Sequence, residues 1–76
     1  MNEFKKNDVI VEIGNNKKLF WIVDMVVNDG YFVASFWDGR IHMAGTWMSF
    51  RTAHESFIKV DEWDNVNMKM KNVEEI

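Results

Sequence analysis

The sequence predicts an all-β fold: a small, strongly bent barrel of five strands, followed by an acidic C-terminal helix or tail. Three observations support this prediction. Short apolar segments follow one another closely, tight-turn sequences separate them, and aromatic residues make up 14% of the 76 residues. Such a chain forms one small domain whose core can be built from a few large side chains. We therefore expect residues 1–60 to form the barrel and residues 61–76 the helix or tail.

The first two strands are expected at residues 8–13 and 18–28. Residues 8–13 (DVIVEI) show the two-residue period of a half-buried strand, and Gly14-Asn15-Asn16 then predicts a turn. Residues 18–28 (KLFWIVDMVVN) are apolar on both faces. A strand of this kind must be covered on both sides or bend sharply, so that its faces enter different layers. Its aromatic and β-branched residues favour a strand over a buried helix.

Two hairpins are expected next, at Asn28-Asp29-Gly30 and at Asp38-Gly39, because Asp-Gly suits tight turns with positive φ. They enclose a third strand at residues 31–37. A fourth strand runs from residue 40 to as far as residue 50. A short turn at residues 51–54 and a fifth strand at residues 56–60 complete the expected barrel.

The fourth strand contains a glycine, Gly45, which predicts a bulge or a bend. Simple alternation along this strand places five residues on one face: Ile41, Met43, Gly45, Trp47 and Ser49. The other face then carries Arg40, His42, Ala44, Thr46 and Met48.

The last sixteen residues change in character. Apolar residues at spacings of three, four and three fall on one face of a helix: Trp63, Val66, Met70 and Val73. Several asparagine and aspartate residues lower the helix propensity, so a docked helix and a frayed tail both stay open. In either case Trp63 is available to cover apolar surface that the barrel leaves exposed.

Charge and composition exclude several classes of protein. Residues 1–60 carry seven acidic and seven basic side chains, so the net charge of −3 lies in residues 61–76. A domain with equal numbers of acidic and basic side chains lacks the excess positive charge that attracts nucleic acid. The absence of cysteine excludes disulfides and thiolate metal sites. The N-terminus lacks a signal-peptide pattern, and the longest uncharged run, residues 41–50, is too short to cross a membrane. A cytoplasmic location is expected.

Three segments resemble parts of SH3-like small barrels. Residues 4–11 (FKKNDVIV) are similar to the first strand of many such domains, and residues 36–40 (FWDGR) resemble the Trp-Asp-Gly hairpin of Tudor-like members. Residues 54–60 (HESFIKV) resemble their short 3₁₀ turn and closing strand. The resemblance covers about residues 4–60 and implies a five-stranded, strongly bent barrel. Such barrels read peptides, bind RNA or serve in assembly, so the fold alone does not assign a function.

The residue pattern does not predict catalysis. The two histidines, His42 and His54, lie on different expected elements, and no serine lies in a nucleophile motif. Two histidines and scattered carboxylates do not predict a metal site either. The sequence therefore predicts a protein that is not an enzyme and holds no cofactor.

The surplus of aromatic residues predicts a protein-binding surface. Residues 19–27 and 31–37 offer thirteen bulky apolar side chains, more than one side of a two-stranded ribbon can bury. The alternative is that all of them belong to the core. Interfaces favour Trp, Tyr, Met and Arg at their centres, so we expect the contact surface to include Tyr31, Trp37, Arg40, Trp47 and Met48. A small accessory or phage-type regulator or inhibitor that docks on a larger protein would have such a surface.

Two other functions stay open. Four lysines, Lys5, Lys6, Lys17 and Lys18, would form a nucleic-acid groove if they converged beside stacking aromatic rings, although such lysines usually solvate loops and protect edges. The two-sided strand at residues 18–28 would instead join two copies in a homodimer. The acidic residues after residue 60 usually form a solvated segment; the alternative is an interaction arm that helps the chain dock on a larger protein.

Overall fold

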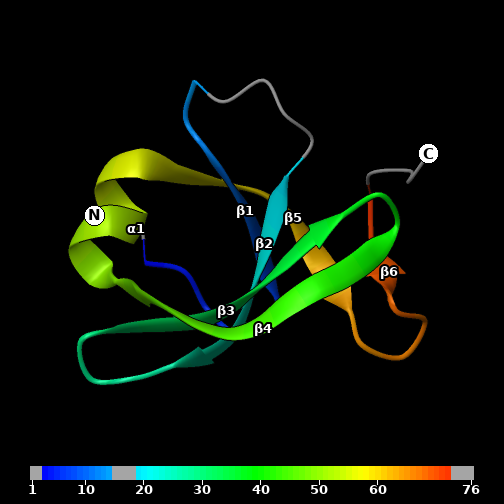
Figure 1. Cartoon of the computed structure of the whole chain (residues 1–76), viewed down its shortest axis with the longest axis horizontal. Coiled ribbons are helices and arrows are strands. Elements are labelled where there is room, and N and C mark those ends of the chain that lie inside the picture. The colour runs from blue at the N-terminus through cyan, green and yellow to red at the C-terminus, as the bar shows by residue number, and fades with distance from the viewer. Residues whose placement is uncertain (1–2, 15–18, 73–76) are drawn as a thin grey trace.

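The computed structural model describes residues 3–14 and 19–72, and in these residues it has one helix and six strands. The elements follow the chain in this order: β1 (Asp8–Glu12), β2 (Phe20–Val26), β3 (Gly30–Trp37), β4 (Arg40–Ser49), α1 (Phe50–Ser56), β5 (Phe57–Asp64) and β6 (Lys69–Met70). The strands pair antiparallel in the order β4-β3-β2-β1-β5-β6, and the sheet curls into a half-barrel (Figure 1). The prediction of a mainly β, small barrel-like fold is confirmed, with β6 as an additional strand.

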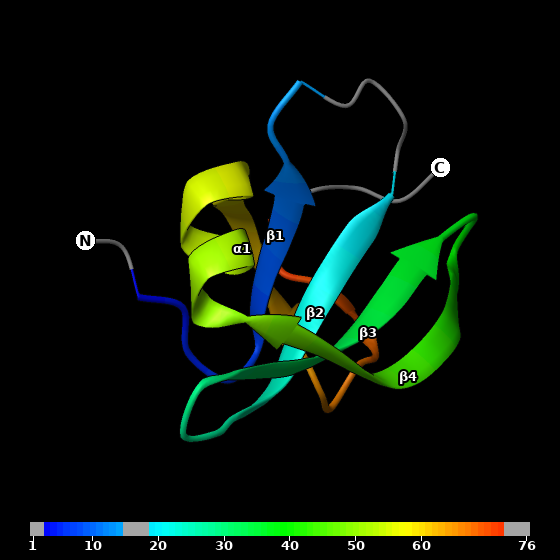
Figure 2. The ribbon, with the colours of Figure 1, turned by 60° about the vertical axis from the view of Figure 1, so that its left-hand side comes forward.

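The sheet buries apolar side chains on both of its faces. On one face, which we call the helix face, α1 contacts β3, β4 and β5 (α1 is at the left in Figure 2), and the buried cluster contains Phe4, Ile10, Val23, Tyr31, Val33, Ala53 and Phe57. On the opposite face, which we call the hairpin face, the buried cluster contains Val9, Ile22, Phe36, Trp63 and Met70. Consecutive residues of β2 thus enter different clusters, as the two-sided apolar sequence of this strand predicts.

Helix α1 stands where the sequence predicts only a short turn at residues 51–54. Ser49 caps the helix, because its Oγ accepts a hydrogen bond of 3.1 Å from the Thr52 N–H. Ala53 is fully buried and holds α1 against the helix face. The cap and this buried contact extend the expected turn to a helix of seven residues.

The turn between β3 and β4 has the predicted conformation. Asp38 and Gly39 have φ angles of 55° and 72°, as a two-residue hairpin turn of this kind requires. Gly45 has a φ angle of 77° and lies at a shift of register in β4, so the predicted bulge is confirmed.

Gly30 serves a different purpose from the one its sequence context predicts. None of residues 28–30 has a positive φ angle, and Gly30 is the first residue of β3. A Cβ at this position would collide with the backbone oxygen of Met48 and would lie 2.7 Å from Nε1 of Trp47. The β2–β3 hairpin is present, but the expected positive-φ turn is wrong, because this glycine is needed for close packing.

The C-terminal segment forms a hairpin, so the expected helix or tail is wrong for the described residues. β5 continues to Asp64, and β6 returns beside it with Trp63 opposite Met70. Both apolar side chains therefore reach the hairpin face, where the Trp63 ring meets the Phe36 ring edge-on at a centroid distance of 5.0 Å. The boundary expected at residue 60 falls inside β5, and residues 73–76 lie outside the described part of the chain.

A side-chain turn explains why these residues do not continue as a helix. Oδ1 of Asp64 accepts the N–H groups of Val66 and Asn67 at 2.9 and 3.1 Å, and Oδ2 accepts the Asn67 side-chain amide at 2.9 Å. Such local bonds offer the backbone an alternative to helical hydrogen bonds. Met68, with a φ angle of 56°, then directs the chain into β6.

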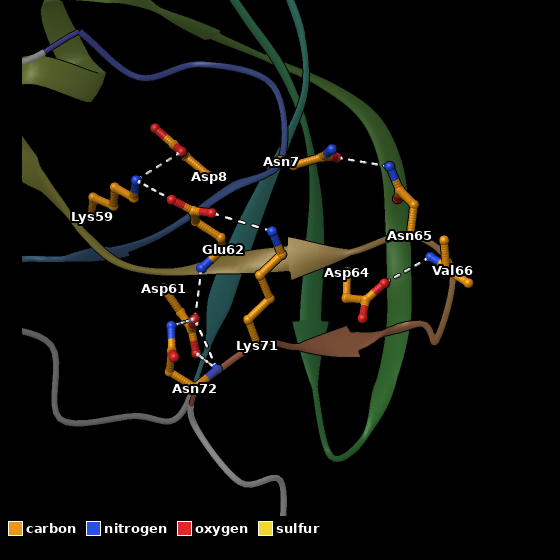
Figure 3. A network of polar contacts seen from close by, with 10 residues as sticks. All are labelled: Asn7, Asp8, Lys59, Asp61, Glu62, Asp64, Asn65, Val66, Lys71 and Asn72. Atoms are coloured by element: carbon orange, nitrogen blue, oxygen red, sulfur yellow. Dashed lines mark hydrogen bonds and ion pairs between the residues drawn. The ribbon is translucent and has the colours of Figure 1, made fainter.

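A polar network holds the β5–β6 hairpin to β1 (Figure 3). The buried Asp8 carboxylate lies 3.2 Å from the Lys59 ammonium, which also donates to Glu62 at 3.0 Å. Asp61 is buried too, and it accepts the main-chain and side-chain N–H groups of Asn72 at 3.0 to 3.2 Å. The carboxylates therefore fix both β5 and the residues that follow β6.

Glu62 makes the stability of the fold depend on pH. The hydrogen bond from Lys59, together with the charges of Lys59 and Lys71, lowers the pKa of Glu62 below its ordinary value of 4.5. Because the folded state prefers the ionised carboxylate, its contribution is complete above pH 4.5 and is lost as the pH falls through the lowered value. We expect urea titrations to show a shallower loss of stability below pH 4.5 in Glu62→Gln than in the unchanged protein.

A second variant controls for the change in net charge. Glu55→Gln removes one carboxylate from an exposed pair with Arg51 on α1, at 3.5 Å. If the Glu62→Gln and unchanged proteins lost stability in parallel as the pH fell, the ion pairs of Glu62 would not contribute to folding.

Candidate functional site

The β3–β4 hairpin carries the residues that the sequence predicts for a binding surface, and two bulges in β4 decide which face each residue occupies. Ala44 and Gly45 together lie opposite the single residue Ala34 of β3. His42 is a second extra residue, closer to the turn. Each extra residue reverses the alternation of side chains along the strand.

The bulges separate residues that simple alternation places together. Met43 pairs with Ser35 on the helix face, whereas Trp47 pairs with Phe32 on the hairpin face. The buried Ser35 hydroxyl accepts the Met43 N–H at 3.1 Å and so satisfies a backbone donor at the second bulge. The prediction that Met43 shares a face with Trp47 is therefore wrong.

Trp37 stands at the end of β3 and is 45% exposed. Its ring stacks on the His42 ring, with centroids 3.8 Å apart and an angle of 10° between the planes. The Trp37 carbonyl accepts a hydrogen bond of 2.9 Å from Nε2 of His42, which therefore carries the proton. This contact holds an exposed indole in one orientation.

Two further exposed side chains lie beside this stacked pair. Arg40 pairs with Trp37 across the turn, and Met43 is 58% exposed on the same face of the sheet. We call these four residues, Trp37, Arg40, His42 and Met43, the tip surface. The turn that carries it lies on the far side of the molecule from α1 (Figure 2).

Tyr31 does not contribute to an exposed surface, so its prediction as a binding residue is wrong. It is 1% exposed, and its hydroxyl accepts the Phe4 N–H at 3.0 Å. The same hydroxyl shares a second hydrogen bond with Nε2 of His54, at 2.7 Å. Burial raises the pKa of Tyr31 above 10.0, and the bond from Phe4 opposes this shift. The residue ties the N-terminal segment to α1.

Trp47 and Met48 point to opposite faces of the sheet. Met48 pairs with Tyr31 and packs, half-buried, against the helix-face cluster. Trp47 is 49% exposed on the hairpin face and covers the backbone of Gly30. The five predicted binding residues therefore do not form one patch: Trp37 and Arg40 lie together at the tip, and Trp47 lies on the other face.

The remaining candidates of the sequence are also placed by the structure. Lys5 and Lys6 are exposed, whereas the other two residues of the predicted nucleic-acid groove, Lys17 and Lys18, lie outside the described residues. Within residues 3–14 and 19–72, no group of three or more histidine, aspartate or glutamate side chains is placed to hold a metal ion. His42 and His54 are engaged separately, with Trp37 and with Tyr31.

The strand proposed for dimer formation, residues 18–28, is an inner strand of the sheet in its described part and has a partner strand on each side at Trp21 and Ile22. β2 lies between β1 and β3 and pairs with both. In the described part of the chain, the outer edges of the sheet belong to β4 and to the two-residue β6. A second copy would therefore meet the sheet at β4 more readily than at β2.

Sequence reasoning missed the contact that His42 makes and a partly exposed row of apolar residues. Nothing in the sequence around His42 indicates its observed contact, which is the stack on Trp37. Met25 and Phe32 lie in one row with Trp47 across three strands of the hairpin face, and Met25 is largely exposed. The run of apolar residues in β2 and β3 was the only sequence signal for this row. It did not show that the three side chains share one face, because the bulges in the sheet decide which face each residue occupies.

Comparison of the chain with protein-family models, curated proteins and solved structures finds no match. The described residues also contain no helix that is long and apolar enough to cross a membrane. The geometry of the exposed side chains is therefore the basis for a functional proposal.

Proposed function

We propose that this protein is a non-catalytic protein-binding module that docks on a larger protein through the tip surface. The observation that carries the proposal is an exposed tryptophan held in place by a stacked histidine, at the end of a hairpin. Tryptophan, arginine and methionine are the residue types that interfaces concentrate at their centres. An exposed indole that is already ordered loses little conformational freedom when it binds.

The fold is compatible with this role. The strongly bent sheet and the short helix immediately before β5 agree with what the resemblance to SH3-like small barrels implies. We extend the proposal to membership of that superfamily. A module of this kind acts by occupying a surface of its target, as an accessory regulator or inhibitor does.

Affinity capture with the tagged protein tests the proposal, and Trp37→Ala is the informative variant. We expect the unchanged protein to retain one protein target after nuclease treatment. Loss of a central interface tryptophan typically costs about 2 kcal/mol or more, so the variant should bind that target ~30-fold more weakly. Because Trp37 is exposed, the variant should keep the circular dichroism spectrum of the folded protein.

Ile58→Ala is the matched control, since Ile58 is 47% exposed and lies on β5, away from the tip. It should bind the target normally. Equal affinity of folded Trp37→Ala and the unchanged protein would remove the tip surface from the proposal. Partners that disappear with nuclease, or an affinity that falls steeply with salt, would favour nucleic-acid binding instead.

A further inference from the structure

The outer edge of β4 is available for pairing with another strand. β4 is the last strand of the sheet, and within the described residues no strand pairs with its outer side. Edge strands are usually protected by lysine, proline, inward-facing charges or bulges. β4 has its bulges at His42 and at Ala44-Gly45, so Thr46–Ser49 pairs regularly with β3 and has none of these protections.

The backbone of Trp47 faces this outer edge. In an antiparallel pair, successive residues direct their N–H and C=O groups alternately toward and away from the neighbouring strand. The Phe50 N–H donates to the Asp29 carbonyl at 3.1 Å, so Met48, two residues earlier, also faces β3. Trp47 therefore directs its N–H and C=O away from β3, toward the open edge, where a further extended strand can pair with both.

The side chains add an apolar row that ends at the same edge. Met25, Phe32 and Trp47 are neighbours across β2, β3 and β4 on the hairpin face. Met25 is 55% exposed, Phe32 is half-buried and Trp47 is about half exposed. The row thus continues the hairpin face beyond the part that Trp63 and Met70 cover, and it stops at the free edge.

We propose that two copies of this chain pair through Thr46–Met48 of β4, antiparallel, with Trp47 of one copy opposite Trp47 of the other. A two-fold axis at this residue lets the two Trp47 backbones exchange both hydrogen bonds. It also joins the two apolar rows into one. The other residue of this stretch that faces the edge, Ser49, caps α1 through its hydroxyl and ends the strand, so it is a poorer centre for the pair.

The absence of charged side chains along this part of β4 favours a second copy of the chain as the partner of its outer edge. No lysine, arginine, aspartate or glutamate lies between Arg40 and Arg51. Self-pairing at Trp47 therefore places no like charges opposite one another, whereas like charges directly opposite are unfavourable in a sheet. Aromatic side chains opposite each other across strands are favourable. The interface is independent of the tip surface, because Trp37 lies on the other face.

The area involved predicts weak, concentration-dependent association. Covering the exposed half of each Trp47 removes on the order of 100 Å² per copy from water. With Phe32, Met25 and the strand backbone, the total stays below the roughly 800 Å² per partner of a standard stable interface. We therefore expect monomer and dimer to exchange within an accessible range of concentration.

Sedimentation equilibrium over a dilution series tests the proposal. We expect the average mass to rise toward that of two chains as concentration increases. Trp47→Lys places two ammonium groups opposite each other at the axis and should remain monomeric at every concentration. Ile58→Lys makes the same kind of change at a matched exposure of 47% and should still dimerise. Circular dichroism establishes that each variant is folded.

Amide hydrogen exchange of the unchanged protein gives a result that needs no variant. The Trp47 N–H should exchange more slowly as concentration rises, while the Met48 N–H, which already faces β3, should keep its rate. A protein that is monomeric at the highest concentration would overturn the proposal. So would a folded Trp47→Lys that still dimerises, or a Trp47 exchange rate that does not depend on concentration.

Discussion

Replacing Trp63 with alanine should leave the protein largely unfolded. The side chain is buried in the hairpin-face cluster and meets the Phe36 ring at 5.0 Å. Tryptophan-to-alanine changes in a core cost about 3–5 kcal/mol. A single core in a chain of this size supplies only about 3–5 kcal/mol in total. Far-UV circular dichroism during a urea titration should therefore show little or no native baseline for Trp63→Ala.

A control variant on the same hairpin tests whether the loss of stability comes from the burial of Trp63 or from the removal of any apolar side chain. Val66 is 89% exposed in the turn between β5 and β6, so Val66→Ala should change stability by no more than about 0.5 kcal/mol. A chain that ends at Val60 should unfold like Trp63→Ala, because it lacks the same contacts. If that shortened chain instead unfolded cooperatively at the midpoint of the full chain, the barrel would be complete without residues 61–72.

The sequence could predict the strands whose pattern reflects local chemistry. The strand at residues 8–12 and the Asp38-Gly39 turn needed no knowledge of neighbours, and the structure has both, but Val9 and Ile10 are both buried where a half-buried strand is predicted. The two-sided pattern of β2 also predicted cover on both faces, which the structure provides at residues 20–23 but not at Met25 and Val26, which are exposed. Ile22 and Val23 enter opposite clusters for this reason. Local propensity and burial agree in these segments, so the prediction succeeds.

The faces of β4 could not be predicted by alternation. Gly45 indicated one bulge, but His42 has no backbone signal for the second one. With two extra residues, Met43 turns to the helix face while Ile41 and Trp47 stay on the hairpin face. The position of the candidate binding residues therefore depends on the pairing with β3, and a single sequence does not specify that pairing.

The C-terminal hairpin shows how one spacing can satisfy two structures. Trp63 and Met70 are seven residues apart, which suits two turns of a helix and also suits opposite positions across a tight hairpin. Two contacts favour the hairpin over the helix: the side-chain turn at Asp64, and the packing of Trp63 against Phe36 on the hairpin face. The packing of Trp63 is a tertiary contact, and helix propensity, which is a local property, does not predict it.

Gly30→Ala should destabilise the protein by about 3 kcal/mol, at the upper end of the cost of overpacking. The new methyl group would meet the backbone oxygen of Met48, and backbone on a paired strand has little freedom to move. Gly39→Asn is the control, because Gly39 has a φ angle of 72° but open space around its Cα, and asparagine tolerates this conformation. It should unfold at nearly the same urea concentration as the unchanged protein.

The double variant Gly30→Ala with Trp47→Ala identifies which neighbour constrains the glycine. Removing the indole relieves the contact at 2.7 Å with Nε1, but the Met48 carbonyl stays in place. We therefore expect the double variant to remain clearly less stable than Trp47→Ala alone. If the two were equally stable, the indole would be the sole obstacle. Gly30 would then be needed only to seat Trp47, and not to let β3 and β4 approach.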